Sequence, residues 1–214
     1  MLTQTYFDRF YDWVVRPVQN QQDIELVDAI DSAHWGNRAF SLEQLILWHQ
    51  AYPPGNRLLC LDDRVVGGIA IWPIDPKQAA AFCAGELPES QLFPLSKGTL
   101  VDDSAPQWPA THWYIGGMII DAPYRIRHSA NPIGMLLTMA LNSWAESGDL
   151  DYPITIFSTA YSPEGEKLLR RFGFDLLRDG NHMPDGDPLY FRTAQDKNSL
   201  FKAFAQHGIP QLFE

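Results

Sequence analysis

The clearest structural signal in the sequence is an amphipathic helix near the middle of the chain. In "ANPIGMLLTMALNSWAE" the apolar residues recur at the three- and four-residue spacing of one helical face; they are Ile133, Leu136, Leu137, Ala140, Leu141 and Trp144. Such a helix must bury its apolar face against another element. The runs "HWYIGGMIID" before it and "YPITIFS" after it are typical of buried strands. This stretch therefore predicts a domain in which helices pack on a β-sheet.

The rest of the chain continues this alternation of strands and helices. A strand near residues 13–18 precedes helices near 23–33 and 41–51, the second of which opens with the capping box "SLEQ". Two apolar runs then flank Asp62 and Asp63, which indicates a hairpin. After the central helix and its strand, "SPEGEKLLRRFGF" predicts a short helix, and two strands follow. The predicted class is α/β, in the order β-α-α-β-β-β-α-β-α-β-β.

Two segments stand apart from this order. Residues 73–111 contain six prolines and an alanine-rich stretch near 78–84 that predicts one helix. Because ordinary connections are far shorter, we expect an insertion over one face of the domain. The segment 195–214 is expected to form a helical tail. No internal repeat or linker interrupts the chain, so residues 1–214 are predicted to form a single domain.

The charge balance restricts the classes of partner. The chain has 26 acidic and 16 basic residues, a net charge of −10. Nucleic-acid binding requires a basic face that neutralises phosphates, so this composition weighs against it. An acidic surface suits a cationic partner, although it also serves solubility.

The cysteine, histidine and hydropathy patterns bear on the cellular compartment and on whether the protein binds a metal. Cys60 and Cys83 lie among apolar or small residues and are expected to be buried thiols in a reducing compartment. The six histidines do not show metal-site spacing, so no metal is predicted. The N-terminal stretch lacks the apolar core of a signal peptide, and no run of about 18 apolar residues occurs. We therefore expect a cytoplasmic protein.

The start of the central helix has two interpretations, of which the first is a plain capped helix. Asparagine at position 131 can cap free amides, and Pro132 at the first helical position lacks only an N–H that the helix does not use. These two residues explain the helix start without any ligand.

The residues before the cap favour the second interpretation, an anion site. The sequence "YRIRHSA" places two arginines and a histidine in one short turn of an acidic chain. Free amides at a helix N-terminus attract an anion, and Gly134 allows close approach because it has no Cβ. The predicted anion-binding residues are Arg125, Arg127, Asn131, Ile133, Gly134 and Met135.

The order of elements and these motifs resemble the GNAT (general N-acetyltransferase) superfamily. The resemblance is carried by the strand and turn "IIDAPYR", by "IG-LL" opening a helix, and by the later helix ending "LLRRFGF". It extends from the first strand near Trp13 to the strand ending near Thr193. It implies a mixed, mostly antiparallel sheet of six to seven strands flanked by helices, with the insertion before the fourth strand.

In that superfamily the turn carries Gln/Arg-x-x-Gly-x-Gly/Ala, whose backbone amides hold the pyrophosphate of acetyl-CoA. The last glycine of this motif corresponds to Gly134. In an alignment without gaps, the Gln/Arg position falls on Ser129 and the first glycine on Pro132. With a longer turn, Arg125 takes the place of the family's arginine. We prefer the second alignment, because it keeps a positive side chain beside the phosphates.

Gly116 and Gly117 add a second feature to the resemblance. Paired glycines inside a strand favour a bulge or a close backbone approach. The resemblance implies that the pantetheine arm of the cofactor bonds to this strand, at Met118, Ile119 and Ile120. The alternative is structural, with two small residues packed under an aromatic side chain such as Trp113.

Candidate catalytic residues follow from the chemistry of acyl transfer to an amine, which needs a proton acceptor for the amine and a proton for the leaving thiolate. Members of the superfamily often supply the acid as a tyrosine in the helix after the penultimate core strand, a position that is Leu169 here. The nearest substitute is Tyr161, at the end of that strand, and His112 is the second candidate. His34, between the first two helices, is expected to line the acceptor pocket.

The resemblance therefore implies an acyl-CoA-dependent acyltransferase, most simply an N-acetyltransferase that moves the acetyl group of acetyl-CoA directly to a small-molecule or peptide amine. No metal, membrane or nucleic acid is expected, and a homodimer is possible. The incomplete loop motif and the missing tyrosine favour an alternative, a catalytically inactive module that binds CoA or another ligand. A likeness of fold alone, without a CoA site, is the third reading.

Overall fold

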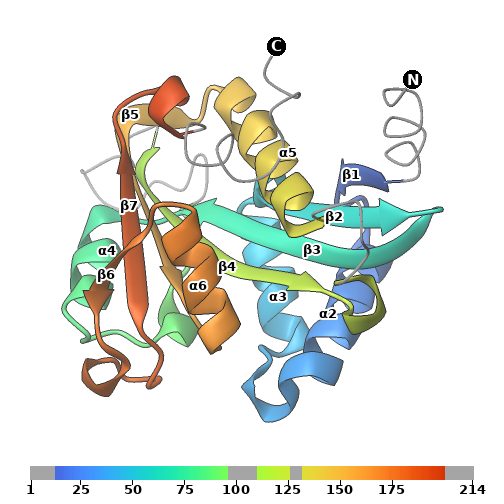
Figure 1. Cartoon of the computed structure of the whole chain (residues 1–214), viewed down its shortest axis with the longest axis horizontal. Coiled ribbons are helices and arrows are strands. Elements are labelled where there is room, and N and C mark those ends of the chain that lie inside the picture. The colour runs from blue at the N-terminus through green and yellow to red at the C-terminus, as the bar shows by residue number, and fades with distance from the viewer. Residues whose placement is uncertain (1–12, 96–109, 126–131, 201–214) are drawn as a thin grey trace. The chain divides into compact units, whose positions relative to one another are not determined.

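A computed structural model of the chain describes residues 13–95, 110–125 and 132–200 (Figure 1). Seven strands form a sheet in the order β1-β2-β3-β4-β5-β7-β6. The strands are β1 (Trp13–Pro17), β2 (Asn56–Leu61), β3 (Arg64–Pro73), β4 (Ala110–Ile120), β5 (Leu150–Thr159), β6 (Asp175–Arg178) and β7 (Leu189–Ala194). The helices are α2 (Gln21–Trp35), α3 (Leu42–Ala51), α4 (Pro76–Cys83), α5 (Pro132–Ser147) and α6 (Pro163–Arg171). The predicted mixed sheet with flanking helices is confirmed.

Short 3-10 helices connect several of these elements. They are η1 (Gly36–Arg38), η2 (Pro53–Gly55), η3 (Glu89–Gln91), η4 (Ala122–Tyr124) and η5 (Gly180–His182).

The pairs β1–β2, β2–β3, β5–β7 and β6–β7 are antiparallel, whereas β4 and β5 run parallel. A parallel pair needs a crossover connection, and the helix α5 lies between these two strands in the chain. The β4–β5 register places His112 opposite Thr155 and ends with Ile115 opposite Ser158, whereas β4 continues to Ile120.

Contacts divide the chain into two compact units. Unit 1 comprises Met1–Ala70 and Gly117–Leu141, and unit 2 comprises Ile71–Gly116 and Asn142–Glu214. The strands β3 and β4 contribute residues to both. The single-domain organisation stays a prediction.

In unit 1 the hairpin β2–β3 packs against α2 (Figure 1). The turn residues Asp62 and Asp63 have φ angles of 49° and 62°, the left-handed values of a two-residue hairpin turn. Val27 and Ile30 of α2 contact a cluster of buried hairpin residues, Leu58, Cys60 and Val65. The predicted hairpin and the helix beside it are therefore confirmed.

Helix caps in both units form where the sequence predicts them. The Ser41 side chain accepts a hydrogen bond from the amide of Gln44 at the start of α3. In unit 2, Ser162 accepts one from the amide of Gly165 at the start of α6, and Pro163 is the first residue of that helix. Gly173 follows α6 with a φ of 76°, a value that favours glycine.

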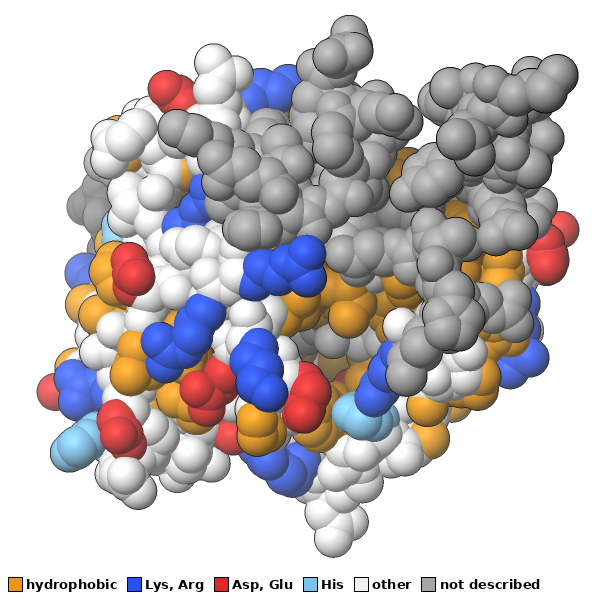
Figure 2. Space-filling view, in the orientation of Figure 1, with side chains coloured by type: hydrophobic (Ala, Val, Ile, Leu, Met, Phe, Trp, Pro, Cys, Tyr) orange, Lys and Arg blue, Asp and Glu red, His pale blue; other side chains and the backbone are white. Residues whose placement is uncertain are grey.

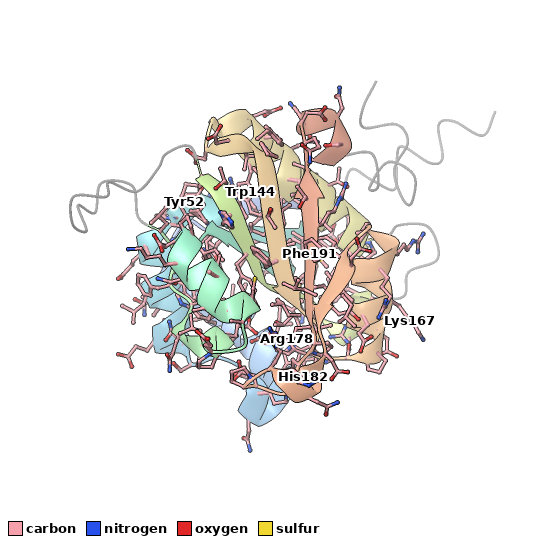
Figure 3. The ribbon with its side chains drawn as sticks, turned by 90° about the vertical axis from the view of Figure 1, so that its left-hand side faces the viewer. Tyr52, Trp144, Lys167, Arg178, His182 and Phe191 are labelled. Atoms are coloured by element: carbon pink, nitrogen blue, oxygen red, sulfur yellow. The ribbon has the colours of Figure 1, made fainter. Side chains whose placement is uncertain are left out.

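The segment predicted as an insertion begins in unit 2 with α4, so the predicted alanine-rich helix is confirmed. The turn after α4 packs against the end of β6: the Arg178 guanidinium donates to the Cys83 carbonyl at 2.8 Å. Gly85 has a φ of 73°, and a Cβ there would lie 2.4 Å from the His182 carbonyl oxygen. Figure 3 shows Arg178 and His182 at the same end of this unit.

Two smaller expectations concern the thiols and the C-terminal tail. Cys60 is buried and Cys83 is half-buried, and both thiols are free. Residues 197–200 are helical, and the Asp196 side chain caps them by accepting from the amide of Ser199 at 2.6 Å. The remainder of the predicted helical tail, residues 201–214, lies outside the described residues.

Candidate active site

The cofactor-binding residues predicted on β4 all belong to unit 1. Met118 is half-buried, whereas Ile119 and Ile120 are buried. The guanidinium Nε of Arg125 donates to the Ile120 carbonyl at 2.6 Å. This hydrogen bond fixes the arginine beside the end of β4, where the sequence predicts a cation for the phosphates.

The predicted anion-binding helix begins at Pro132, as its first position. Ile133 is half-buried and Gly134 is buried in the first turn of α5. The backbone of Met135 is helical, and its side chain lies outside the described part of the structure. Arg127 and Asn131 also lie outside it, so their predicted roles stay predictions.

A second basic group of unit 1 lies near Arg125. The pKa of His34, in the last turn of α2, is lowered first by burial and second by the charge of Arg125. The charge of Arg125 therefore acts on His34, although the two residues are far apart in the sequence. A bound anion would oppose this shift, because it stabilises the protonated imidazole.

The two glycines on β4 differ, and each fits one of the two interpretations that the sequence left open. A Cβ on Gly116 would lie 1.7 Å from a ring carbon of Trp72, so this glycine is required by packing. A Cβ on Gly117 would meet no atom within 4 Å among the described residues. The aromatic partner is Trp72, whereas Trp113 packs against Trp144 with ring centroids 6.1 Å apart. Gly116 is therefore structural, and Gly117 leaves open space beside the strand.

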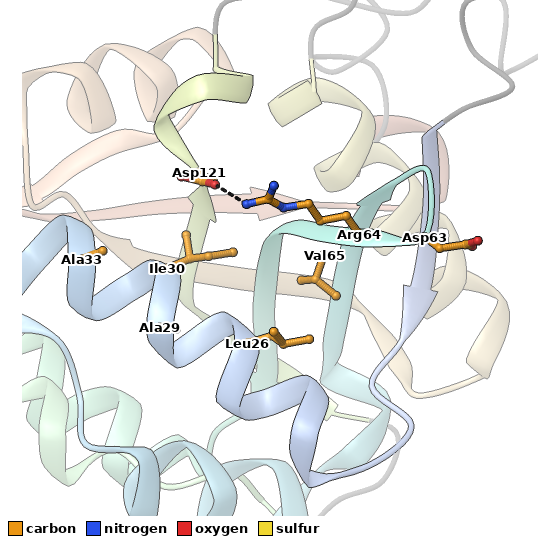
Figure 4. Close-up of a pocket in the computed structure, with 8 residues that line it drawn as sticks. All are labelled: Leu26, Ala29, Ile30, Ala33, Asp63, Arg64, Val65 and Asp121. Carbon is orange, nitrogen blue, oxygen red and sulfur yellow. Dashed lines mark ion pairs between the residues drawn. The ribbon is translucent and has the colours of Figure 1, made fainter.

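Unit 1 also contains a pocket of about 500 Å³ beside the end of β4 (Figure 4). One face of α2 lines its apolar side, and the hairpin turn and Asp121 line its polar side. The Arg64 guanidinium lies 3.9 Å from the Asp121 carboxylate across this side. The pocket contains none of the predicted site residues, although Asp121 directly follows β4.

In unit 2, Tyr161 belongs to a buried network of hydroxyl groups around one carboxylate. The Tyr161 hydroxyl donates to Glu89 Oε2 at 2.5 Å, and the Thr159 hydroxyl donates to the same oxygen at 2.8 Å. The Tyr114 hydroxyl lies 2.9 Å from Thr159 Oγ1. Because Thr159 donates its proton to Glu89, Tyr114 is the donor to Thr159. The network joins η3, β4, the end of β5 and the residue before the α6 cap.

Burial sets the protonation of Glu89. The residue is 2% exposed, and burial raises the pKa of its carboxyl to about 7, although the hydroxyl donors oppose this shift. The charge of Asp185 adds to the rise; this carboxylate also accepts the backbone N–H of Glu89 at 2.7 Å. The second oxygen, Oε1, is buried without a hydrogen-bond partner among the described residues. Glu89 is thus a buried carboxyl that titrates near neutral pH.

Sequence reasoning missed Glu89. It lies in "LPESQLF", within the segment interpreted only as an insertion. The only signal in the sequence was an acidic residue three positions before Leu92, which the structure buries. That signal does not reveal the partners of Glu89, which are 70 and 72 residues further along the chain.

The structure does not bring His112 to this network. Thr111 Oγ1 lies 2.9 Å from His112 Nδ1, the ring stacks on Phe157, and burial lowers the pKa of the imidazole. His112 is opposite Thr155 in the β4–β5 register, four residues before Thr159. At about 3.3 Å per residue, this separation is about 13 Å along the strand.

Two further sequence expectations concern the residue at position 169 and the absence of a metal site. Leu169, at the position of the family's tyrosine, is 8% exposed and belongs to the core. Within the described residues, no group of three or more His, Cys, Asp or Glu side chains could hold a metal ion. None of the helices in the described ranges is long and apolar enough to cross a membrane. Basic and acidic side chains are interspersed on the face drawn in Figure 2.

Comparisons with known proteins identify the fold. No protein-family model and no curated protein matches the sequence. The loading GNATL domain of CurA from Lyngbya majuscula matches at a TM-score of 0.60 and 15% identity, over 85% of this chain and 97% of that domain. The GphF GNAT-like decarboxylase, in complex with isobutyryl-CoA, matches at 0.56 and 14%, over 84% and 98%.

A third solved structure has a small amine as its substrate. The diaminobutyrate acetyltransferase EctA from Paenibacillus lautus, in complex with L-2,4-diaminobutyric acid and coenzyme A, matches at a TM-score of 0.53 and 13% identity, over 86% of this chain and 95% of that one. These likenesses show that the chain has the GNAT fold, as the sequence predicted.

Proposed function

We propose that this protein is an acyl-CoA-dependent acyltransferase that moves an acyl group, most simply acetyl, directly to an amine. The observation that carries the proposal is the fixed position of Arg125 at the end of β4, shortly before the N-terminus of α5. A guanidinium and helix-terminal amides together suit a pyrophosphate, because both stabilise negative charge. His34, on which the charge of Arg125 acts, adds an imidazole to this part of unit 1.

The solved structures support a CoA-type cofactor more directly than acetyl transfer. GphF was solved with isobutyryl-CoA and EctA with coenzyme A. GphF is described as a decarboxylase, so the GNAT fold alone does not specify the reaction. An amine acceptor is supported by the net charge of −10, because an acidic protein attracts cations. A small-molecule or peptide amine fits this argument equally.

One observation favours a second function, a CoA-binding module without turnover. Leu169 occupies the position where the superfamily often has its tyrosine acid, and it is buried in the core. The two functions share the cofactor and differ only in the chemistry of unit 2.

Calorimetric titration with acetyl-CoA tests the proposed cofactor. Replacing Arg125 with alanine removes one charge-assisted bond, worth roughly 1.5–3 kcal/mol, and should weaken CoA about 10- to 100-fold. Pantetheine, which lacks the nucleotide phosphates, should bind both proteins alike. Lys167→Ala, an exposed cation on α6, is the matched control and should change neither affinity. If wild type binds neither acetyl-CoA nor CoA, the proposal fails.

A thiol-release assay against a panel of primary amines separates the two functions. Turnover with any amine supports the transferase. Tight CoA binding without turnover would favour the binding module.

A further inference from the structure

We infer that Glu89 is the base that receives the proton of the acceptor amine, through the hydroxyl group of Tyr161. The inference rests on the proposed acyltransferase function and assigns the proton transfer within it. Tyr161 is then the catalytic residue that touches the substrate, and Glu89 acts through it.

The hydrogen bonds of the network already form such a path. Tyr161 donates its only hydroxyl proton to Glu89 Oε2, so the lone pairs of its oxygen are the groups that can accept a proton from an amine. Thr159 donates to the same carboxylate oxygen and helps to hold the carboxylate in place. A proton arriving at Tyr161 can therefore displace the hydroxyl proton along an existing hydrogen bond to Glu89.

The proposed path requires Glu89 to be more deeply buried than Tyr161, and the structure shows this difference. Glu89 is 2% exposed, whereas Tyr161 is half-buried. Tyr161 is therefore the more exposed member of the pair, and the inference assigns the contact with substrate to it. The buried carboxylate stores the proton, and the hydroxyl group exchanges it with the substrate.

The surroundings of Glu89 favour proton uptake. The groups that contact its carboxylate are neutral hydroxyls, and the nearby Asp185 is acidic. Its Oε1 is buried without a hydrogen-bond partner among the described residues, which destabilises the ionised form. Burial accordingly raises the pKa of Glu89 to about 7, so a fraction is ionised at neutral pH and can act as a base.

The same surroundings change the role expected for Tyr161. Burial and the charge of Glu89 raise the pKa of Tyr161 well above its usual value. A thiolate with a pKa of about 8–9 is a weaker base than the ionised form of this tyrosine, so Tyr161 alone is a poor proton source for it. A relay to Glu89 needs no net ionisation of the tyrosine.

The ammonium group of the acceptor gives one proton to Tyr161, whose own proton moves to Glu89, and a neutral amine remains. The amine lone pair forms the C–N bond with the thioester carbonyl carbon. The C–S bond then breaks with its electron pair on sulfur. A second proton leaves the nitrogen and neutralises the thiolate, and Glu89 releases its proton to solvent.

The experiment measures kcat/KM for acetyl-CoA and a primary amine against pH, together with the Kd of CoA. Wild type should show an ionisation near pH 7. Glu89→Gln keeps a hydrogen-bonding oxygen and cannot accept a proton, so it should lose this ionisation and about 10²- to 10⁴-fold in kcat. The Kd of CoA should not change. Tyr161→Phe should have a similar effect, and the double variant should be no slower than either single one.

The Tyr190–Glu166 pair provides matched controls in the same unit. The Tyr190 hydroxyl donates to Glu166 at 2.8 Å, but the Glu166 side chain is 39% exposed and lies near Arg170. Glu166→Gln and Tyr190→Phe should leave kcat and the pH profile unchanged.

Three results would overturn the inference. One is an unchanged ionisation in Glu89→Gln with kcat intact. Another is an equal loss of kcat in the control variants. If Glu89→Gln does not fold, Thr159→Val is decisive, because removing a donor to the carboxylate must raise the pH of the ionisation; an unmoved profile contradicts the inference. Wild-type turnover separates failure of the acyltransferase proposal from failure of the inference about Glu89. If wild type shows no turnover, both are overturned; if wild type turns over, the three results above test Glu89 alone.

Discussion

Each of the two units buries a carboxylate, and the two are held in opposite ways. In unit 1, Asp23 is 5% exposed and accepts two hydrogen bonds of 2.7 Å from the Arg16 guanidinium. The hydrogen bond from Arg16 is the largest cause of its lowered pKa. In unit 2, Glu89 is 2% exposed, is contacted by hydroxyl groups, and has its pKa raised to about 7 by burial.

The difference separates a structural carboxylate from a titratable one. Arg16 holds Asp23 in its charged form, and the ionised aspartate also accepts the backbone N–H of Gln19 at 2.8 Å near the N-terminus of α2. Such a group carries a fixed charge at neutral pH. Glu89 receives hydrogen bonds without a compensating charge, so its proton can come and go near pH 7. Groups perturbed in this second way are the ones that suit acid–base chemistry.

The largest expected effect is a pH dependence of stability caused by Glu89. Its folded pKa of about 7 exceeds the usual value of 4.5, so the folded state binds more protons between these values. The free energy of unfolding should therefore fall as pH rises from about 4.5 to 7, by roughly 3 kcal/mol from this group. Denaturant unfolding of wild type and Glu89→Gln across this range measures the effect. The difference between the two proteins should be constant if Glu89 does not titrate there.

A smaller effect is expected when the cation of unit 1 is removed. Arg16→Leu keeps an apolar stem and leaves Asp23 without its charged donor, which should cost about 2 kcal/mol and lower Tm by on the order of 4–8 °C. Because the pKa of Asp23 is lowered, this stabilisation is present above its usual value of 3.8 and is lost as pH falls through the folded pKa.

The control for this loss is Arg64→Leu in the same unit. Its nitrogen lies 3.9 Å from Asp121 and its side chain is 67% exposed, so the change should stay within about 0.5 kcal/mol. Equal melting temperatures for Arg16→Leu and wild type would show that the pair does not stabilise unit 1.

The parts of the molecule that could be predicted from the sequence depend on local signals. The caps of α3 and α6 and the Asp62–Asp63 turn each require only neighbouring residues, and all three are confirmed. The apolar stripe of α5 is also local, since its period alone indicates a helix. The GNAT fold was recognised from the order of such elements.

The candidate site could be predicted only in part, because its chemistry depends on distant contacts. The sequence selected Tyr161 as an acid, but the carboxylate beside it comes from an irregular segment 72 residues away. Its backbone is held by Asp185, which is 96 residues away. The role of Trp72 against Gly116 was likewise invisible, since the choice among several aromatic residues requires the strand pairing. No periodic pattern carries this information.

Tyr114→Phe is expected to change stability less than either substitution above. The change removes the hydroxyl that donates to Thr159 and leaves the ring packing intact. The Tyr114 hydroxyl also lowers the pKa of Glu89, so its loss should raise that pKa further. We expect a loss of about 1 kcal/mol in stability and an upward shift of the wild-type pH transition. An unshifted transition would separate Tyr114 from the network.

The smallest effect is expected for Glu166→Gln, which tests whether burial, rather than the tyrosine–glutamate bond itself, creates the titratable group. Glu166 accepts a hydrogen bond of 2.8 Å from Tyr190, as Glu89 does from Tyr161, but its side chain is 39% exposed and lies 3.8 Å from the Arg170 guanidinium. Water and this cation can both stabilise its charge, so the substitution should change stability by less than about 0.5 kcal/mol at any pH between 4.5 and 8. The measurement is the same series of denaturant unfolding curves. A pH-dependent difference as large as that of Glu89→Gln would mean that the hydrogen bond to tyrosine, and not desolvation, causes the pH dependence that we assign to Glu89.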